Sequence, residues 1–171
     1  MTAAQPATPA NPTAPPAEQT ALLQELERLL PVLKEADPSD ARRAEALLEA
    51  RCPRAGLRAA RIEALARVGV RDGWLLPRSA GPKVRYGRLA KDLGGYTVDF
   101  VLMEGPAAGH THVNGEVNLG FRWSGDPKFD GRPTGWVVFP PGSHHVPTVT
   151  GGEMLLAYFL PGGKVVWDPA A

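Results

Sequence analysis

The sequence predicts a mainly β protein preceded by a short α-helical segment, and three observations support this class. Up to about residue 68, apolar residues recur at three- and four-residue steps, as on one face of a helix. After Gly69 the chain changes to short alternating runs rich in β-branched and aromatic residues, separated by Gly and Pro. No helical periodicity lies between these runs, which is typical of an antiparallel sandwich or barrel.

The 171 residues suffice for one compact domain with an appendage. We expect three segments along the chain. Residues 1–17 consist of Met, Thr, Ala, Gln, Asn and Pro, and the prolines prevent a continuous helix or strand, so this segment is expected to be a disordered tail. A helical segment should follow at 18–68, and the β domain should occupy 69–171.

The first helix is predicted from Glu18 to about Lys34. Leucines fall on one of its faces, at Leu22, Leu23, Leu26, Leu29, Leu30 and Leu33. Pro31 should kink this helix or end it early, because proline lacks a backbone donor and clashes with the preceding turn. The leucine face must be covered, either by the β domain or by a second subunit.

Two shorter helices should follow. Asp37 is suited to cap the second helix with Pro38 at its first position, and Pro53 stops this helix. The third helix is predicted from about Leu57 to Arg67, with Gly69 as its C-terminal residue. Arginines alternate with glutamates over this segment, which favours a solvated ion-pair face over a nucleic-acid surface.

The β half contains five predicted strands. Alternation is clearest at 96–103 and 116–123, and further strands are expected at 135–139, 154–160 and 164–167. The dipeptide Asn114-Gly115 directly before the second of these runs is typical of a tight hairpin turn.

Composition argues against several partners. The formal net charge is +1 without blocks of like charge, so the chain lacks the basic surface expected for nucleic acid or an anionic membrane. The single cysteine, Cys52, cannot form an intrachain disulfide, which fits a reducing compartment. The longest apolar run, 154–160, is too short to cross a bilayer, and neither a basic residue nor an apolar signal segment precedes Arg28. We therefore expect a cytoplasmic protein without membrane or nucleic-acid partners.

All four histidines lie in the β half, beside a carboxylate. If 110–112 is a strand, His110 and His112 point to the same side, and a hairpin at Asn114-Gly115 lets Glu116 approach them. Two imidazoles and a carboxylate would provide three metal ligands, and a later histidine the fourth. The alternative is a set of surface or hydrogen-bonding histidines that share this half by chance.

Two stretches around the histidines resemble the motifs of the cupin superfamily. Residues 109–116 are similar to the first motif, and residues 135–145 contain the P-x-G-x-x-H core of the second. Cupins are double-stranded β-helix (jelly-roll) barrels that often hold Fe, Mn, Ni or Zn. The resemblance implies such a barrel here, with a divalent metal ion bound by His110, His112, Glu116 and His145. His144 would point to the opposite side of its strand.

Within the cupins, residues 95–165 resemble the small 4-hydroxylaminobenzoate lyases of nitrobenzoate degradation. The resemblance implies a C–N lyase that converts 4-hydroxylaminobenzoate to 3,4-dihydroxybenzoate (protocatechuate) with loss of ammonia. Such a reaction needs an acid rather than a redox partner. A metal ion could act as a Lewis acid or supply hydroxide. If no metal is bound, Glu116 and His145 could carry the catalytic proton transfers.

The implied substrate is a small aromatic carboxylate, for which arginine is the natural partner. If Glu116 faces the barrel interior, strand alternation turns Arg122 inward as well, where an arginine without an anion is costly. Arg122 is therefore the candidate carboxylate anchor. The alternatives are a solvated Arg122, an Arg122 paired to the turn residues Asp126 or Asp130, and an anchor at Arg85 or Arg88.

Four aromatic residues are candidates to bind the substrate ring, although aromatic residues in strands are often plain core: Trp136, Tyr158, Phe139 and Phe100. Two other function classes remain open. One is a metal-dependent dioxygenase or isomerase acting on another small aromatic or keto acid. Oxygen consumption during turnover would identify a dioxygenase. The other is a non-catalytic cupin that binds a small molecule. A homodimer is expected, because cupin barrels often pair.

Overall fold

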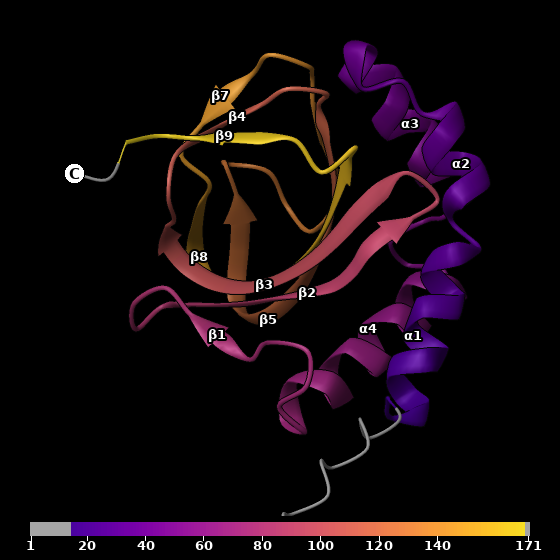
Figure 1. The fold of residues 1–171 in the computed structure, drawn as a ribbon, viewed down its shortest axis with the longest axis vertical. Coiled ribbons are helices and arrows are strands. Elements are labelled where there is room, and N and C mark those ends of the chain that lie inside the picture. Colours follow the sequence, from indigo (N-terminus) through magenta and orange to yellow (C-terminus); the bar gives the residue numbers. More distant parts are fainter. Residues whose placement is uncertain (1–14, 170–171) are drawn as a thin grey trace, which may run out of the picture.

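The computed structural model describes residues 15–169, in which helices cover one side of a β barrel (Figure 1). The helical elements are α1 (Ala17–Glu27), α2 (Leu30–Glu35), the 3-10 helix η1 (Pro38–Asp40), α3 (Ala41–Arg51) and α4 (Leu57–Arg71). The predicted tail at 1–17 lies mostly outside the described residues, and Ala17 already begins α1. Within the described part of the chain, no helix is long and apolar enough to cross a membrane.

The strands are β1 (Arg78–Ser79), β2 (Val84–Leu93), β3 (Tyr96–Pro106), β4 (His110–His112), β5 (Glu116–Phe129), β6 (Gly135–Phe139), β7 (His144–His145), β8 (Thr148–Pro161) and β9 (Val165–Trp167). All five predicted strands are present. β1 and β2 were not predicted from the sequence, and β2 carries several charged residues and has an irregular burial pattern.

The break predicted at Pro31 is confirmed. Pro31 occupies the first turn of α2, where its missing N–H has no helical partner to lose. From the predicted leucine face, Leu22, Leu26 and Leu33 are fully buried. The pattern therefore located the buried face correctly, although it runs over two helices.

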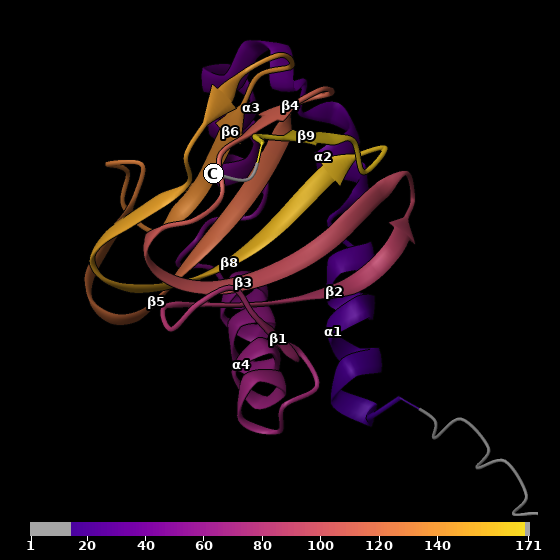
Figure 2. The same cartoon turned by 60° about the vertical axis from the view of Figure 1, so that its left-hand side comes forward.

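The predicted cap at Asp37 is confirmed for η1, where its Oδ1 accepts a 2.9 Å hydrogen bond from the Ser39 N–H. A second carboxylate, Asp40, caps α3 by accepting from the Arg43 N–H at 3.2 Å. The two caps follow one another in sequence at η1 and α3, and this segment lies beside β6 (Figure 2).

The predicted end of the third helix was wrong. α4 continues to Arg71, so Gly69 lies inside the helix rather than at its C-terminus. A Cβ atom at Gly69 would lie 2.6 Å from the Trp74 ring and 2.8 Å from the Leu75 side chain. The glycine is therefore required by close packing of the following loop and not by helix termination.

Two antiparallel sheets form the barrel (Figure 2). The larger has the order β1-β2-β3-β8-β5-β6, and the smaller has the order β7-β4-β9. β8 lies between β3 and β5, so a strand from late in the sequence is inserted between two earlier strands. These crossed connections make the molecule a cupin-type, mainly β barrel behind a helical segment, which confirms the predicted fold class.

The predicted hairpin at Asn114-Gly115 is wrong. β4 pairs with β7 and β9, whereas β5 pairs with β6 and β8, so the dipeptide joins the two sheets instead of two paired strands. Gly115 has a φ of +83°, and a Cβ there would lie 2.7 Å from Pro38. The glycine permits a sharp corner beside Pro38 of η1, and this corner still brings Glu116 close to the histidines.

Strand alternation separates two apolar cores. On the outer face of β5, Val117, Leu119 and Phe121 pack in one cluster with the helix leucines. A smaller cluster inside the barrel includes Met103, Phe129, Val137, Leu156 and Tyr158. Glu116 and Asn118 alternate with the outer residues and are buried on the inner face. Polar groups of β5 therefore enter the barrel interior, as predicted.

Candidate active site

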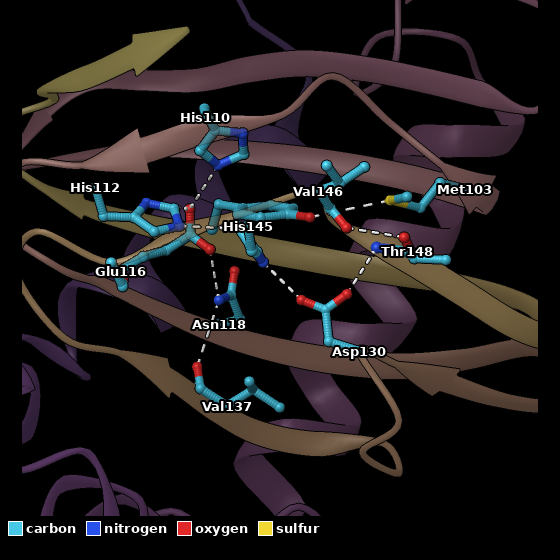
Figure 3. A network of polar contacts seen from close by, with 12 residues as sticks. Met103, His110, His112, Glu116, Asn118, Asp130, Val137, His145, Val146 and Thr148 are labelled. Atoms are coloured by element: carbon cyan, nitrogen blue, oxygen red, sulfur yellow. Dashed lines mark hydrogen bonds and ion pairs between the residues drawn. The ribbon is translucent and has the colours of Figure 1, made fainter. Parts of the chain in front are cut away.

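Three of the four histidines converge inside the barrel (Figure 3). His110 and His112 belong to β4, and β4 pairs with β7 so that His110 lies opposite His145. One ring nitrogen from each of the three lies within 4.8 Å of the other two. The side-chain period of two in β4 and the register with β7 thus bring together the three histidines that the sequence singled out.

Two of these rings are held by their Nδ1 atoms. His110 Nδ1 donates to the Ala108 carbonyl at 3.0 Å, and His145 Nδ1 donates to Oδ2 of Asp130 at 2.6 Å. The Nε2 atom of each neutral ring then carries the lone pair. Metal-binding histidines are generally oriented by such a contact on the other ring nitrogen.

His112 completes the cluster. It is fully buried, and its Nδ1 has no hydrogen-bond partner among the described residues. Its Nε2 lies 3.0 Å from Nε2 of His145. Two imidazoles that bind one zinc ion at 2.0–2.1 Å have their nitrogens roughly 3 Å apart. This separation and the oriented rings of His110 and His145 fit a divalent metal ion.

Burial keeps His110 and His112 neutral, as metal ligands must be. It lowers the pKa of His112 to about 3, and the neighbouring His110 and His145 add to the shift. Burial also lowers the pKa of His110, although its hydrogen bond to Ala108 opposes the shift. Neither ring therefore gains a proton near neutral pH.

Glu116 is 1% exposed at the start of β5. Its Oε2 lies 3.4 Å from His112 Nδ1 and 4.0 Å from His110 Nε2, while Oε1 accepts a 2.7 Å hydrogen bond from Asn118. Burial raises the pKa of Glu116 to about 8, against the lowering effect of the Asn118 hydrogen bond. The group is thus a neutral acid near pH 7 by itself, whereas an adjacent cation would favour the carboxylate.

Asp130 belongs to the site, although the sequence alone indicates only a turn residue and a possible partner of Arg122 at this position. It forms a two-residue turn with Gly131, both at positive φ, between Phe129 and Arg132. Oδ2 holds His145, and Oδ1 accepts a 2.8 Å hydrogen bond from the Thr148 N–H. The dipeptide Asp130-Gly131 predicts the turn from local sequence. The contact with His145 depends on the fold, which brings this turn after β5 close to β7.

His144 lies on the opposite side of β7 from His145, as predicted. It is exposed, and its Nε2 lies 3.0 Å from the Asp168 carboxylate. Its distance from the cluster follows from strand alternation.

The structure brings only some of the predicted substrate-binding residues to the histidines. Tyr158 is buried inside the barrel, directly opposite Asn118 and 6.1 Å from the Phe129 ring. Phe139 lies opposite Glu116, and its ring centre is 4.2 Å from that of His145. These two aromatic residues share the interior with the site.

Trp136 and Arg122 lie elsewhere. Because Val137 faces the barrel interior, its neighbour Trp136 faces the helices, where its indole N–H donates to the Cys52 carbonyl at 2.8 Å. Arg122 is exposed and lines a surface hollow. At 3.3 Å per residue, the six residues from Glu116 place Arg122 about 20 Å away along β5.

A family model matches most of the chain. The model, described as PnbB, 4-hydroxylaminobenzoate lyase, covers residues 27–167. The chain belongs to the 4-hydroxylaminobenzoate lyase family. The match includes the helical segment from the end of α1 as well as the whole barrel, which confirms the predicted family and the predicted lyase class.

Two relatives carry the name of this lyase family. The chain is 34% identical over 122 residues to a 4-hydroxylaminobenzoate lyase of Nocardioides sp., with 63% of this chain and 71% of the relative covered. It is 28% identical over 130 residues to the 4-hydroxylaminobenzoate lyase of Pseudomonas putida, with 63% and 73% covered.

Among solved structures, the lyase-family chain is similar to an RmlC-like cupin protein of Ralstonia eutropha, with 12% identity, a TM-score of 0.42, and 56% of this chain and 66% of that chain covered. It is also similar to a salicylate 1,2-dioxygenase of Pseudaminobacter salicylatoxidans, with 13% identity and a TM-score of 0.41. That match covers 66% of this chain and 38% of the dioxygenase.

Proposed function

We propose that the protein converts 4-hydroxylaminobenzoate and water to 3,4-dihydroxybenzoate and ammonia. In this balance the N–O bond breaks, an oxygen is placed on the neighbouring ring carbon, and hydrolysis of the resulting imine releases ammonia without an external oxidant or reductant. The observation that carries the proposal is the convergence of three imidazoles and a buried carboxyl group inside the barrel of a lyase-family chain.

We propose His110, His112 and His145 as ligands of a divalent metal ion, with Glu116 as the fourth ligand. Three neutral imidazoles and a carboxylate suit several ions, so Fe, Mn, Ni and Zn all remain candidates. When bound, such an ion supplies a Lewis acid for the hydroxylamine oxygen or a hydroxide at neutral pH.

If no metal ion is bound, the proton transfers fall to Glu116 and His145. Oε2 of Glu116 lies 3.4 Å from Nδ1 of His112, whose Nε2 lies 3.0 Å from Nε2 of His145. Without a metal ion, the proton that Glu116 holds near neutral pH can be given to the departing oxygen. Tyr158 and Phe139 exclude water beside these groups and offer apolar surface to the substrate ring.

Cell compartment and assembly belong to the same proposal. The single cysteine is buried and unpaired within the described residues, which supports a cytoplasmic location. Exposed apolar side chains on or directly after the strands of the small sheet support a homodimer that covers them: Val113, Val146, Val166 and Trp167.

The test is turnover of 4-hydroxylaminobenzoate by the purified full chain without oxygen, before and after treatment with a chelator. We expect ammonia and 3,4-dihydroxybenzoate in equal amounts, with loss of both after chelation and recovery on adding a divalent metal. Turnover that survives chelation would assign the chemistry to Glu116 and His145 alone. Absence of product in every arm, or product formation only with oxygen consumption, would contradict the lyase function.

A further inference from the structure

Arg132 lies at the rim of the histidine site. It pairs with Phe129 across the Asp130-Gly131 turn, and residues paired in this way project from the same face. Phe129 is fully buried in the barrel interior, with its ring centre 6.1 Å from that of His145. Arg132 therefore extends from the inner face of the barrel at the end where the turn holds His145.

An aromatic ring connects Arg132 to the histidines. The guanidinium carbon lies 5.7 Å from the centre of the Phe139 ring, and that ring centre lies 4.2 Å from the centre of the His145 ring. The guanidinium and the His145 ring are thus no more than about 10 Å apart. Within this limit, a benzoate can contact the guanidinium through its carboxylate and the histidines through a reacting group on the opposite side of its ring.

Arg132 is fixed in place but retains free donors. Glu45 of α3 accepts from Arg132 Nη1 and, at 2.9 Å, from the Val138 N–H, so this carboxylate ties Arg132 to the free edge of β6. A guanidinium has five N–H donors, and the described contacts use only the Nη1 end. The side chain is 40% exposed and lines a hollow of about 500 Å³ beside α3. Because of this exposure of the side chain, an anion can reach the remaining donors.

We propose that Arg132 binds the carboxylate of the aromatic substrate, with the ring beside Phe139 and the hydroxylamine directed to the histidines and Glu116. This inference rests on the proposed function and names the residue that selects a carboxylated arene. Arg122, the anchor expected from strand alternation, lies about 20 Å from Glu116 along β5, too far for one small ring to reach both.

The test compares binding of two unreactive analogues, 4-hydroxybenzoate and phenol, to the full chain by calorimetry. They differ only in the carboxylate, so their affinity ratio isolates its recognition. We expect the wild type to prefer 4-hydroxybenzoate. Arg132→Met should weaken 4-hydroxybenzoate binding by about 10- to 100-fold, the usual value of hydrogen bonds to a charged group, and change phenol binding by less than about two-fold. Arg132→Lys should retain part of the preference.

Two controls separate recognition from folding and general charge. Arg42→Met removes another exposed arginine from the same hollow and should leave the preference intact. Glu45→Gln removes the ion pair but keeps the guanidinium, so its preference should persist even if its melting temperature falls.

The inference is overturned if the wild type shows no preference, if Arg132→Met keeps the wild-type preference, or if Arg122→Met abolishes it. Turnover of 4-hydroxylaminobenzoate by the wild type is measured separately. Absence of turnover with the carboxylate preference intact would contradict the proposed function while still supporting Arg132 as the anchor.

Discussion

Glu116 joins two features that make a carboxyl group chemically useful: it is almost fully buried, and it lies beside imidazole nitrogens. Glu116→Gln keeps the size of the side chain and an oxygen for the Asn118 hydrogen bond, but removes both the acid and the anionic ligand. We expect ammonia release to fall at least about 100-fold, because positioned proton transfer contributes this much or more. The melting temperature should not fall, since no buried packing is lost. Turnover within about two-fold of wild type would contradict both roles of Glu116.

Asp130 acts on the site through His145. Asp130→Asn retains a residue that tolerates the φ of +48°, but its single oxygen cannot accept from both His145 and Thr148. Loss of such an orienting contact generally weakens metal binding by about 10- to 100-fold. Competition with a chelator should show this loss for zinc, whereas Asp126→Asn on the exposed part of β5, the strand directly before the turn, should bind zinc normally. Equal zinc affinity in the two variants would contradict a positioning role for Asp130.

How far sequence could predict the site depends on whether a contact is local. His110 and His112 face the same side because the strand period is two, and this could be predicted from the residues alone. The Asp130 contact with His145 and the position of Phe139 opposite Glu116 depend on strand register. No alternation within one strand contains that information.

The same distinction holds at the scale of whole elements. The leucine face of α1 and α2 was predicted from periodicity, as was the inner and outer alternation at the start of β5. The Asn114-Gly115 corner was mistaken for a hairpin, because the dipeptide permits a sharp turn but does not say which strands pair after it. Trp136 was a candidate to bind the substrate ring because its strand was predicted without knowing which of its side chains face the barrel interior.

The packing of α3 against β6 gives a test of that facing direction. Trp136 donates to the Cys52 carbonyl from within the helix-facing core. Trp136→Phe leaves this carbonyl without its donor, and we expect the free energy of unfolding to fall by about 1–3 kcal/mol. Because Trp136 points away from the histidines, KM for 4-hydroxylaminobenzoate should stay within about two-fold of wild type. A raised KM at unchanged stability would instead restore Trp136 as a substrate-binding residue.

The thiol of Cys52, at the C-terminal end of α3, makes the stability of the protein sensitive to alkaline pH. Burial raises the pKa of this thiol above its ordinary 9.0. The folded protein thus binds the thiol proton more tightly than the unfolded chain, so this contribution is complete below about pH 9 and is lost as pH rises towards the folded pKa. We expect urea unfolding to show stability falling from pH 8 to pH 10, and falling less steeply in Cys52→Ala. Parallel pH profiles for the two proteins would contradict this role of the thiol.

At the scale of the whole molecule, the two faces of β5 have different roles: the outer face stabilises the fold, and the inner face belongs to the candidate site. The outer side chains of β5, such as Val117 and Leu119, pack with the helices, while Glu116 and Asn118 on its inner face belong to the site. The helices therefore support the strand that carries the buried carboxyl group without contributing a side chain to the histidine cluster. Burial of that strand on both faces keeps Glu116 away from water.

Because one apolar cluster spans the helices and the outer face of the barrel, we expect the described helical layer and the barrel to unfold together. Ile62 of α4 is fully buried in this cluster, and Ile62→Ala should lower the free energy of unfolding by about 2–5 kcal/mol. Urea titration followed by far-UV circular dichroism and by tryptophan fluorescence should give one shared midpoint, which the variant lowers equally for both signals. Separate midpoints, or a loss confined to the helical signal, would show that the helices form an independent unit and that the barrel holds its site without them.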